Sequence, residues 1–165
     1  MYTLWLMPDK EAYQKLSKLI IDLSSLHETP EFEPHVTLLS GIMDEEAQAI
    51  QKTAQLANQF SKISANLNRI DFLELFYRCL FFHTNKSQAL MEIRSAAEDL
   101  FEHTNITPFV PHVSFLYGSL PIFQKEAIIA ELGEAFFINF NMTRIRLVKT
   151  QRTPEYWTLI KEFDL

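Results

Sequence analysis

Two short segments of the chain, FEPHVTLLSG at residues 32–41 and FVPHVSFLYG at residues 109–118, contain residue types suited to proton transfer. They agree at six of ten positions, and a threonine in the first is matched by a serine in the second. Their histidines, His35 and His112, are 77 residues apart (112 minus 35), and so are the glycines that end the two segments. The chain therefore contains two equivalent His-x-Thr/Ser motifs, which indicates an internal duplication.

The spacing within each motif predicts a histidine and a hydroxyl group side by side. Residues i and i+2 of a strand point to the same face, so His35 shares a face with Thr37, and His112 with Ser114. A neutral imidazole can deprotonate a water while a protonated one donates to a leaving oxygen, each role being worth about 10²–10⁴-fold in rate. The hydroxyls can bind the non-bridging oxygens, where negative charge develops. This combination predicts in-line cleavage of a phosphodiester.

Other kinds of site find little support in the sequence. A single His-x-Thr/Ser triplet is weak evidence, because a lone strand histidine is more often structural, and it is the duplication that favours function. Neither triplet has a neighbouring histidine or carboxylate pattern typical of a metal site, and the chain has no G-x-S-x-G elbow or phosphate-binding glycine loop. The only cysteine, Cys79, excludes an intrachain disulfide and a cysteine-based metal site. We therefore expect no metal and no cofactor.

The elements that must position these motifs repeat in the same order: strand, helix, strand beginning at Pro-His, helix, long strand. In the first half the expected elements are a strand at 2–7, a helix capped by Asp9, a strand at 35–42, a helix from Asp44 to about Phe60, and a strand at 63–75. In the second half they are a strand at 78–84, a helix containing Leu90 to Phe101, a loop at 103–111, a strand at 112–118, a helix from Ser119 to Gly133, and strands at 137–150 and 155–163.

This repeated order predicts an α+β fold made by duplication. We expect a single domain over residues 1–165 with two pseudo-symmetric lobes, about 1–75 and 76–165, and two antiparallel sheets around a central cleft with helices on the outside. His35 and His112 would then face each other across the cleft. A doubly wound parallel sheet fits the same order, but the closing run of long alternating strands favours antiparallel pairing.

Composition and charge limit the classes of partner. The 165 residues carry a formal net charge of −6, which argues against a track for long nucleic acid but allows a small phosphorylated ligand. The N-terminal apolar run ends at Pro8 without a basic flank, and no run of about 18 apolar residues occurs, so neither a signal peptide nor a membrane span is expected. We expect a cytoplasmic monomer.

The motifs resemble those of the two-histidine phosphoesterase superfamily, whose signature is a pair of H-x-[ST] motifs on a duplicated α+β fold. FEPHVT, FYRCLFF at 76–82, PHVSFLY at 111–117 and Trp157 are similar to the cyclic phosphodiesterase branch known from plants and yeast. The resemblance implies metal-independent opening of nucleoside 2′,3′-cyclic phosphates to 2′-phosphates, and of ADP-ribose 1″,2″-cyclic phosphate to the 1″-phosphate. Some plant members carry several cysteines, and this chain has one.

The resemblance also implies roles for individual residues. It makes His35 and His112 the catalytic pair, with His112 as base and His35 as acid, although the near-symmetry of the motifs leaves these two roles open. It makes Thr37 and Ser114 phosphate-binding residues, and it adds Tyr117 and Trp157 as substrate-binding residues. Strict alternation turns Tyr117 away from the face of His112, but the adjacent glycine can end the strand, so its direction stays open.

Three further aromatic residues, Trp5, Phe76 and Tyr77, can stack on a base, but aromatic residues in strands are mostly core. Two alternative functions also remain. One is an enzyme acting on RNA ends, as an RNA 2′,3′-cyclic phosphodiesterase or 2′–5′ RNA ligase-like protein. The other is a catalytically silent module that binds a nucleotide, against which the two complete motifs argue.

Overall fold

The computed structural model describes residues 1–103 and 108–165, so the loop expected at 103–111 lies partly outside the described residues. The elements within them are β1 (Tyr2–Pro8), α1 (Lys10–His27), β2 (Val36–Ile42), α2 (Glu46–Ala57), β3 (Ile63–Asp71), the 3₁₀ turn η1 (Phe76–Arg78), β4 (Leu80–Thr84), α3 (Gln88–Leu100), β5 (His112–Leu116), α4 (Ile122–Leu132), β6 (Asn139–Lys149), the 3₁₀ turn η2 (Pro154–Tyr156) and β7 (Thr158–Asp164).

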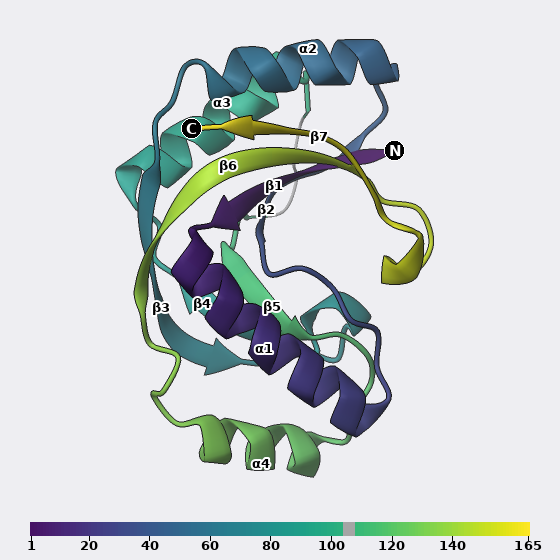
Figure 1. The fold of residues 1–165 in the computed structure, drawn as a ribbon, viewed down its shortest axis with the longest axis vertical. Helices are drawn as coiled ribbons and strands as arrows, with labels where there is room; N and C mark the ends of the chain where they lie inside the picture. The colour runs from purple at the N-terminus through teal and green to yellow at the C-terminus, as the bar shows by residue number, and fades with distance from the viewer. Residues whose placement is uncertain (104–107) are drawn as a thin grey trace.

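The strands form one antiparallel sheet in the order β1-β2-β5-β4-β3-β6-β7. β6 also pairs with β1, so six of the described strands close into a ring, and β7 extends β6 outside it (Figure 1). The α+β class and the antiparallel pairing are confirmed. The two separate sheets are not confirmed, because the pairing of Val36 with Val113 joins β2 to β5 and makes the sheet continuous.

The pairing of Val36 with Val113 also locates the symmetry axis of the duplication. These valines occupy the same position in the two motifs, and a two-fold axis requires equivalent residues to be each other's partners. The sheet order obeys the same symmetry, since exchanging β1 with β4, β2 with β5 and β3 with β6 reproduces the ring. The two sequence halves are interleaved: β3 pairs with β4 and β6 of the second half, and β6 pairs back to β1 and β3.

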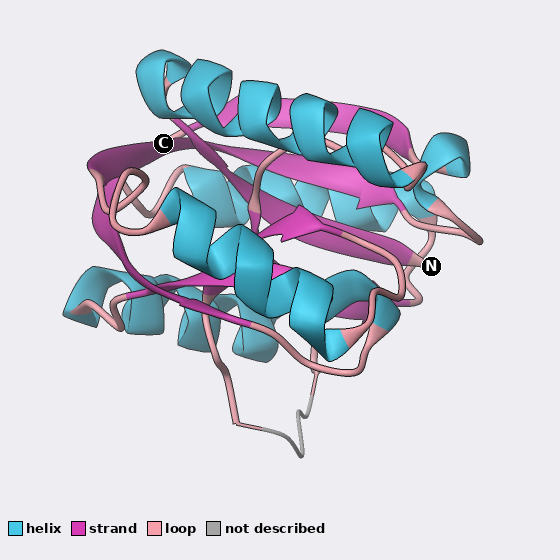
Figure 2. Cartoon of the chain, turned by 90° about the horizontal axis from the view of Figure 1, so that it is seen from below, coloured by secondary structure: helices cyan, strands magenta, loops and turns pink. Residues whose placement is uncertain are grey.

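Helices cover the outside of the strands (Figure 2). α1 packs on β1 and β5, α2 and α3 pack together at one end of the molecule, and α4 lies at the opposite end (Figure 1). Their apolar faces and the inward-facing strand residues form one main core, which includes Leu4, Leu38, Phe82 and Phe115. No helix in the described ranges has the length and apolar character needed to cross a bilayer.

Two helix ends follow local chemistry as expected, and two helices begin later than expected. The carboxylate of Asp9 caps α1 by accepting from the Ala12 amide at 3.1 Å, as expected. Gly133 ends α4 with φ of 50°, a conformation that favours glycine. α2 begins at Glu46, two residues later than expected, and the carboxylate of Asp44 instead binds the Lys52 ammonium at 2.6 Å. α4 begins at Ile122, after Pro121, rather than at Ser119.

The segment between β3 and β4 departs most from the sequence prediction, and it reaches the site. β3 ends at Asp71 rather than at residue 75, and η1 replaces the expected start of β4. The buried ammonium of Lys125, from α4, donates to the Leu73 carbonyl at 3.2 Å and to the Glu74 carboxylate at 2.7 Å. These bonds take the chain out of the strand and direct η1 toward β5.

Candidate active site

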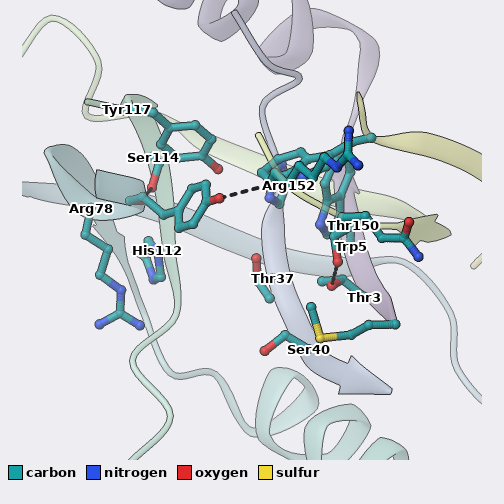
Figure 3. Close-up of a pocket in the computed structure, with 15 residues that line it drawn as sticks. Thr3, Trp5, Thr37, Ser40, Arg78, His112, Ser114, Tyr117, Thr150 and Arg152 are labelled. Carbon is teal, nitrogen blue, oxygen red and sulfur yellow. Dashed lines mark hydrogen bonds between the residues drawn. The ribbon is translucent and has the colours of Figure 1, made fainter. Parts of the chain in front are cut away.

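The antiparallel neighbours β2 and β5 bring the two histidines to one place. His35 directly precedes β2, His112 is the first residue of β5, and the residues that follow them pair with each other. Both histidines line a cavity of about 510 Å³ (Figure 3). Its other lining residues are Met1, Thr3, Trp5, Thr37, Ser40, Tyr77, Arg78, Ser114, Tyr117, Thr150, Gln151, Arg152 and Trp157. The six residues singled out in the sequence therefore share one cavity.

The two imidazoles are anchored in the same way. His35 Nδ1 lies 2.6 Å from the Glu33 carbonyl oxygen, and His112 Nδ1 lies 2.8 Å from that of Val110, two residues earlier in each case. A carbonyl oxygen can only accept, so Nδ1 of each ring carries the hydrogen. Nε2 is thus the basic nitrogen of each neutral imidazole, and the bond at Nδ1 fixes its direction.

An aromatic ring from the neighbouring strand supports each histidine. Trp5 of β1 stacks on His35 with ring centroids 3.8 Å apart and 12° between the planes. Phe81 of β4 meets His112 edge-on at 5.2 Å. These contacts restrict ring rotation, and they also remove water from the imidazoles.

Removal from water decides the protonation of the free site. Burial lowers the pKa of His35 to about 4, with the Glu33 carbonyl opposing the shift and His112 adding to it. Burial likewise lowers the pKa of His112 to about 4, with the Val110 carbonyl opposing it and Arg78 adding to it. At neutral pH both imidazoles are therefore unprotonated, so each can act as a base and neither as an acid.

The two hydroxyls differ in their hydrogen bonds. Ser114 Oγ donates to the Tyr77 carbonyl of η1 at 2.8 Å, so its only hydrogen is already engaged. Thr37 faces the cavity, and within residues 1–103 and 108–165 no group bonds to its hydroxyl (Figure 3). Thr37 is therefore the free donor of the pair, and Ser114 must turn its hydrogen away from η1 before it can donate to a ligand.

Tyr117 lines the cavity despite the alternation argument. β5 ends at Leu116, so strand alternation no longer applies to the next residue. The Tyr117 ring is buried and stacks on Phe32 at 3.5 Å, with Tyr77 edge-on at 5.3 Å, and burial raises the pKa of its hydroxyl. Its position is thus fixed by packing around the first motif's own phenylalanine.

Trp157 completes an aromatic wall of the cavity. It lies after η2, 5.5 Å from the Trp5 ring, 5.8 Å from Tyr77 and 6.0 Å from Tyr117, measured between centroids. Its indole Nε1 is shielded from solvent and has no hydrogen-bond partner in the described part of the chain. Trp5 and Tyr77, for which the sequence favoured a core position, belong to the same wall.

Two cationic residues, Arg78 and Arg152, also line the cavity, and sequence reasoning missed Arg78. Arg78 is the last residue of η1, and Figure 3 shows its side chain beside His112. The guanidinium of Arg152 lies over the Tyr156 ring at 5.6 Å. The backbone carbonyl of Arg152 accepts a hydrogen bond from the Tyr77 hydroxyl at 3.2 Å. Arg78 was read as the start of a strand, and only the turn formed by η1 brings it to the cavity.

The described residues contain no group of three His, Cys, Asp or Glu side chains placed to hold a metal ion. The absence of a metal requirement stays a prediction.

A comparison with protein families identifies the chain. The family model described as "Cyclic phosphodiesterase-like protein" matches residues 1–165. The chain belongs to this family. The membership predicted in the two-histidine phosphoesterase superfamily and the predicted enzyme class, a cyclic phosphodiesterase, are thereby confirmed.

Individual relatives agree with the family match. An Arabidopsis thaliana cyclic phosphodiesterase is 25% identical over 171 residues, covering 99% of this chain and 94% of its own. The structure of TT0787 of Thermus thermophilus superposes with a TM-score of 0.68 at 14% identity over 99% of this chain and 97% of the other. E. coli LigT complexed with 3′-AMP has a TM-score of 0.58 at 14% identity over 99% and 96%. These two structures share the fold of the cyclic phosphodiesterase-like chain.

Proposed function

We propose that this single-domain protein hydrolyses cyclic phosphodiesters without a metal ion, through His35 and His112. The observation that carries the proposal is the matched anchoring of the two imidazoles, each held through Nδ1 in one cavity. Water attacks phosphorus opposite the leaving oxygen, His112 Nε2 accepts the water proton, and His35 Nε2 donates a proton to the leaving oxygen. With a nucleoside 2′,3′-cyclic phosphate, the bond from phosphorus to O3′ breaks and the product is the 2′-phosphate.

The negative charge of the substrate protonates the histidine that acts as the acid. Both imidazoles are neutral at pH 7 in the free protein, since the pKa of each is about 4. A phosphodiester monoanion about 4 Å from an imidazolium contributes ~4 kcal/mol at an effective dielectric constant of about 20, which equals ~3 pKa units. Binding therefore raises the pKa of one histidine toward about 7, and that histidine becomes the acid.

The hydroxyls and Arg78 bind the charged oxygens. Thr37, whose hydroxyl is free within the described chain, donates to a non-bridging oxygen, and Ser114 does the same after its hydrogen leaves the Tyr77 carbonyl. The guanidinium of Arg78 beside His112 offsets the charge that gathers on the phosphoryl group as the ring opens.

The cavity favours a nucleotide-sized substrate. Its volume of about 510 Å³ lies within the usual range for small-ligand pockets, about 300–1,000 Å³. The wall formed by Trp5, Tyr77, Tyr117 and Trp157 provides faces on which a base or ribose can stack. Structural neighbours were solved with 3′-AMP and with uridine monophosphate, which supports the same ligand class here. We infer that nucleoside 2′,3′-cyclic phosphates and ADP-ribose 1″,2″-cyclic phosphate are the substrates.

The test is hydrolysis of 2′,3′-cyclic AMP and of ADP-ribose 1″,2″-cyclic phosphate in the presence of EDTA, with 2′- and 3′-phosphate products separated by chromatography. We expect turnover of at least one compound and only the 2′-phosphate from cyclic AMP. A matched control is His27→Ala, which removes a histidine at the end of α1, outside the cavity lining.

Three outcomes would overturn the proposal. Loss of activity with EDTA would show that a metal is required. Cleavage of a short RNA ending in a 2′,3′-cyclic phosphate, without cleavage of either small compound, would favour the enzyme acting on RNA ends. Nucleotide binding without any turnover would favour the silent module.

A further inference from the structure

The two catalytic histidines are anchored alike but have different neighbours. Glu33 and Val110 occupy equivalent positions, 77 residues apart (110 minus 33), and each supplies the backbone carbonyl that holds an imidazole. Only the first has a carboxylate. A symmetric reaction needs no such difference, whereas a reaction with one acid and one base does.

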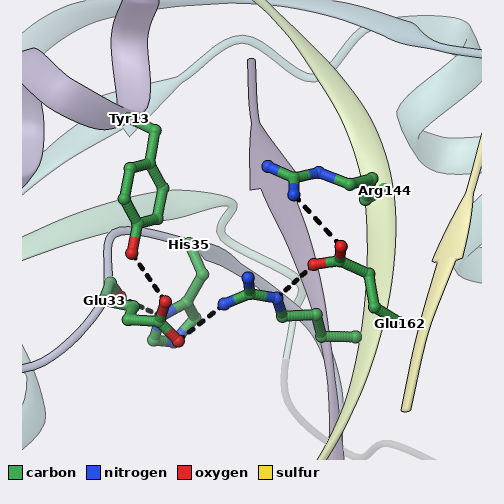
Figure 4. A network of polar contacts seen from close by, with 6 residues as sticks. Tyr13, Glu33, His35, Arg144 and Glu162 are labelled. Atoms are coloured by element: carbon green, nitrogen blue, oxygen red, sulfur yellow. Dashed lines mark hydrogen bonds and ion pairs between the residues drawn. The ribbon is translucent and has the colours of Figure 1, made fainter. Parts of the chain in front are cut away.

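The Glu33 carboxylate is held in place by two donors from other elements. The Tyr13 hydroxyl of α1 donates to Glu33 Oε1 at 2.6 Å, and Arg146 of β6 donates to Oε2 at 2.6 Å (Figure 4). Burial alone raises the pKa of Glu33, but these two bonds outweigh it and lower the pKa, so the carboxylate is ionised at neutral pH. Glu33 is not among the residues that line the cavity, so its effect on the reaction passes through His35.

Arg146 is in turn bound by a second carboxylate. Its Nε donates to Glu162 Oε2 at 2.5 Å, and Arg144 donates to Glu162 Oε1 at 3.1 Å (Figure 4). Arg146 is therefore shared between two carboxylates, of which only Glu33 is close to His35 in the chain. Glu162 lies on β7, outside the closed ring, and provides a natural control for the network as a structural unit.

Apart from the effect of the two histidines on each other, the charged groups around them act in opposite directions. The Glu33 carboxylate favours the protonated form of His35 and outweighs Arg146, which disfavours it, although a protonated His112 disfavours it more strongly than Glu33 favours it. Arg78 disfavours the protonated form of His112, as does His83, which lies beyond the Phe81 ring and binds Asp71 at 3.0 Å. Within the described residues, no carboxylate acts on His112 in the way that Glu33 acts on His35.

We propose that Glu33, fixed by Tyr13 and Arg146, is a positioning residue that directs the single proton of the histidine pair to His35. Arg78 acts in the same sense by keeping His112 in its basic form. The proposal rests on the proposed function, because it explains how a nearly symmetric pair takes two unequal roles. Glu33 itself touches neither the substrate nor the reacting atoms.

Histidine ¹⁵N NMR titration of the whole protein between pH 3 and pH 8 tests this without relying on activity. In Glu33→Gln we expect the pKa of His35 to fall by at least about half a unit while that of His112 stays unchanged. In Arg78→Gln we expect the pKa of His112 to rise.

The control Glu162→Gln separates charge from structure. It disrupts the same network while leaving the Glu33 carboxylate in place, and we expect the pKa of His35 to stay within about 0.2 units of wild type. Equal shifts in the pKa of His35 in Glu162→Gln and Glu33→Gln would show that the network is only structural and overturn the proposal. An unchanged pKa of His35 in Glu33→Gln would also overturn the proposal.

Kinetics provide the second readout. In Glu33→Gln we expect kcat for 2′,3′-cyclic AMP to fall at least about threefold above pH 7, which is the loss of protonated His35 that a half-unit drop in pKa produces, with recovery toward lower pH and little change in KM. If wild type hydrolyses neither cyclic compound, the proposed function fails, while the NMR titration still decides where the proton lies. An equal loss of kcat at every pH in Glu33→Gln would contradict the role given to Glu33.

Discussion

Acidification should destabilise this protein through its two buried histidines. In the folded state the pKa of each is lowered to about 4, whereas an unfolded chain restores the ordinary value of about 6.5. The unfolded state therefore binds protons first as the pH falls. The stability that comes from keeping the imidazoles neutral is fully present above about pH 6.5 and is lost as the pH falls through 4.

The size of the effect follows from this difference in pKa. A gap of about 2.5 units corresponds to ~3.4 kcal/mol per histidine once the pH is below both values. Between pH 7.5 and pH 5, where the native carboxylates remain largely ionised, the expected loss is ~2 kcal/mol for His35 and ~2 kcal/mol for His112. Together they lower the free energy of unfolding by ~4 kcal/mol, a large part of the stability of a typical domain.

Urea denaturation at pH 7.5 and pH 5, followed by tryptophan fluorescence and circular dichroism, measures this loss. We expect His35→Gln to remove about half of it, because glutamine does not titrate. A pH-independent free energy of unfolding in wild type would refute the argument, since it would mean that the two imidazoles are solvated in the folded protein. An equal loss in wild type and His35→Gln would refute it for His35.

Three further predictions concern the reaction. Thr37→Ala should lower kcat by about tenfold to a hundredfold and more than Ser114→Ala does, because the Ser114 hydrogen is already engaged with Tyr77; equal losses would contradict this. The acidic limb of the pH profile of kcat/KM should report a pKa of about 4, that of the histidines in the free enzyme, whereas the pH profile of kcat should report a pKa of about 7. The same pKa in both profiles would disprove substrate-assisted protonation. Trp5→Leu should lower kcat more than Trp157→Leu, because only Trp5 stacks on His35. A larger loss of kcat in Trp157→Leu would contradict this role of the Trp5 ring.

The motif repeat alone predicted much of the site. Equivalent residues at a constant offset imply a two-fold relation, and the pairing of Val36 with Val113 satisfies it in the structure. Local chemistry was enough for the Asp9 cap and for the end of α4 at Gly133, because each depends on residues a few positions apart. Such features need no knowledge of the tertiary fold.

Features that depend on distant contacts could not be predicted. The closing of the ring needs the register of β6 against β1, which neither strand encodes alone. The path of η1, which places Arg78 and the Tyr77 carbonyl, depends on the Lys125 ammonium from α4, about fifty residues away in the chain. The direction of Tyr117 likewise follows from stacking on Phe32 rather than from strand alternation.

The partners of Glu33 illustrate the same limit. The sequence shows a glutamate two residues before His35, but its carboxylate meets Tyr13 and Arg146 only because α1 and β6 flank that segment. The side chain of Arg146 is half-buried in an ion-pair network with Glu33 and Glu162. Charge patterns along one strand do not reveal partners that lie on other elements.

The most direct test of the account compares wild type with His35→Ala, His112→Ala and the double variant in 2′,3′-cyclic AMP hydrolysis with EDTA. We expect each single variant to lose at least about 10²-fold in kcat/KM. The double variant should lose far less than the product of the two, because acid and base act in one step. Wild-type activity in either single variant would contradict the claim that both histidines transfer protons.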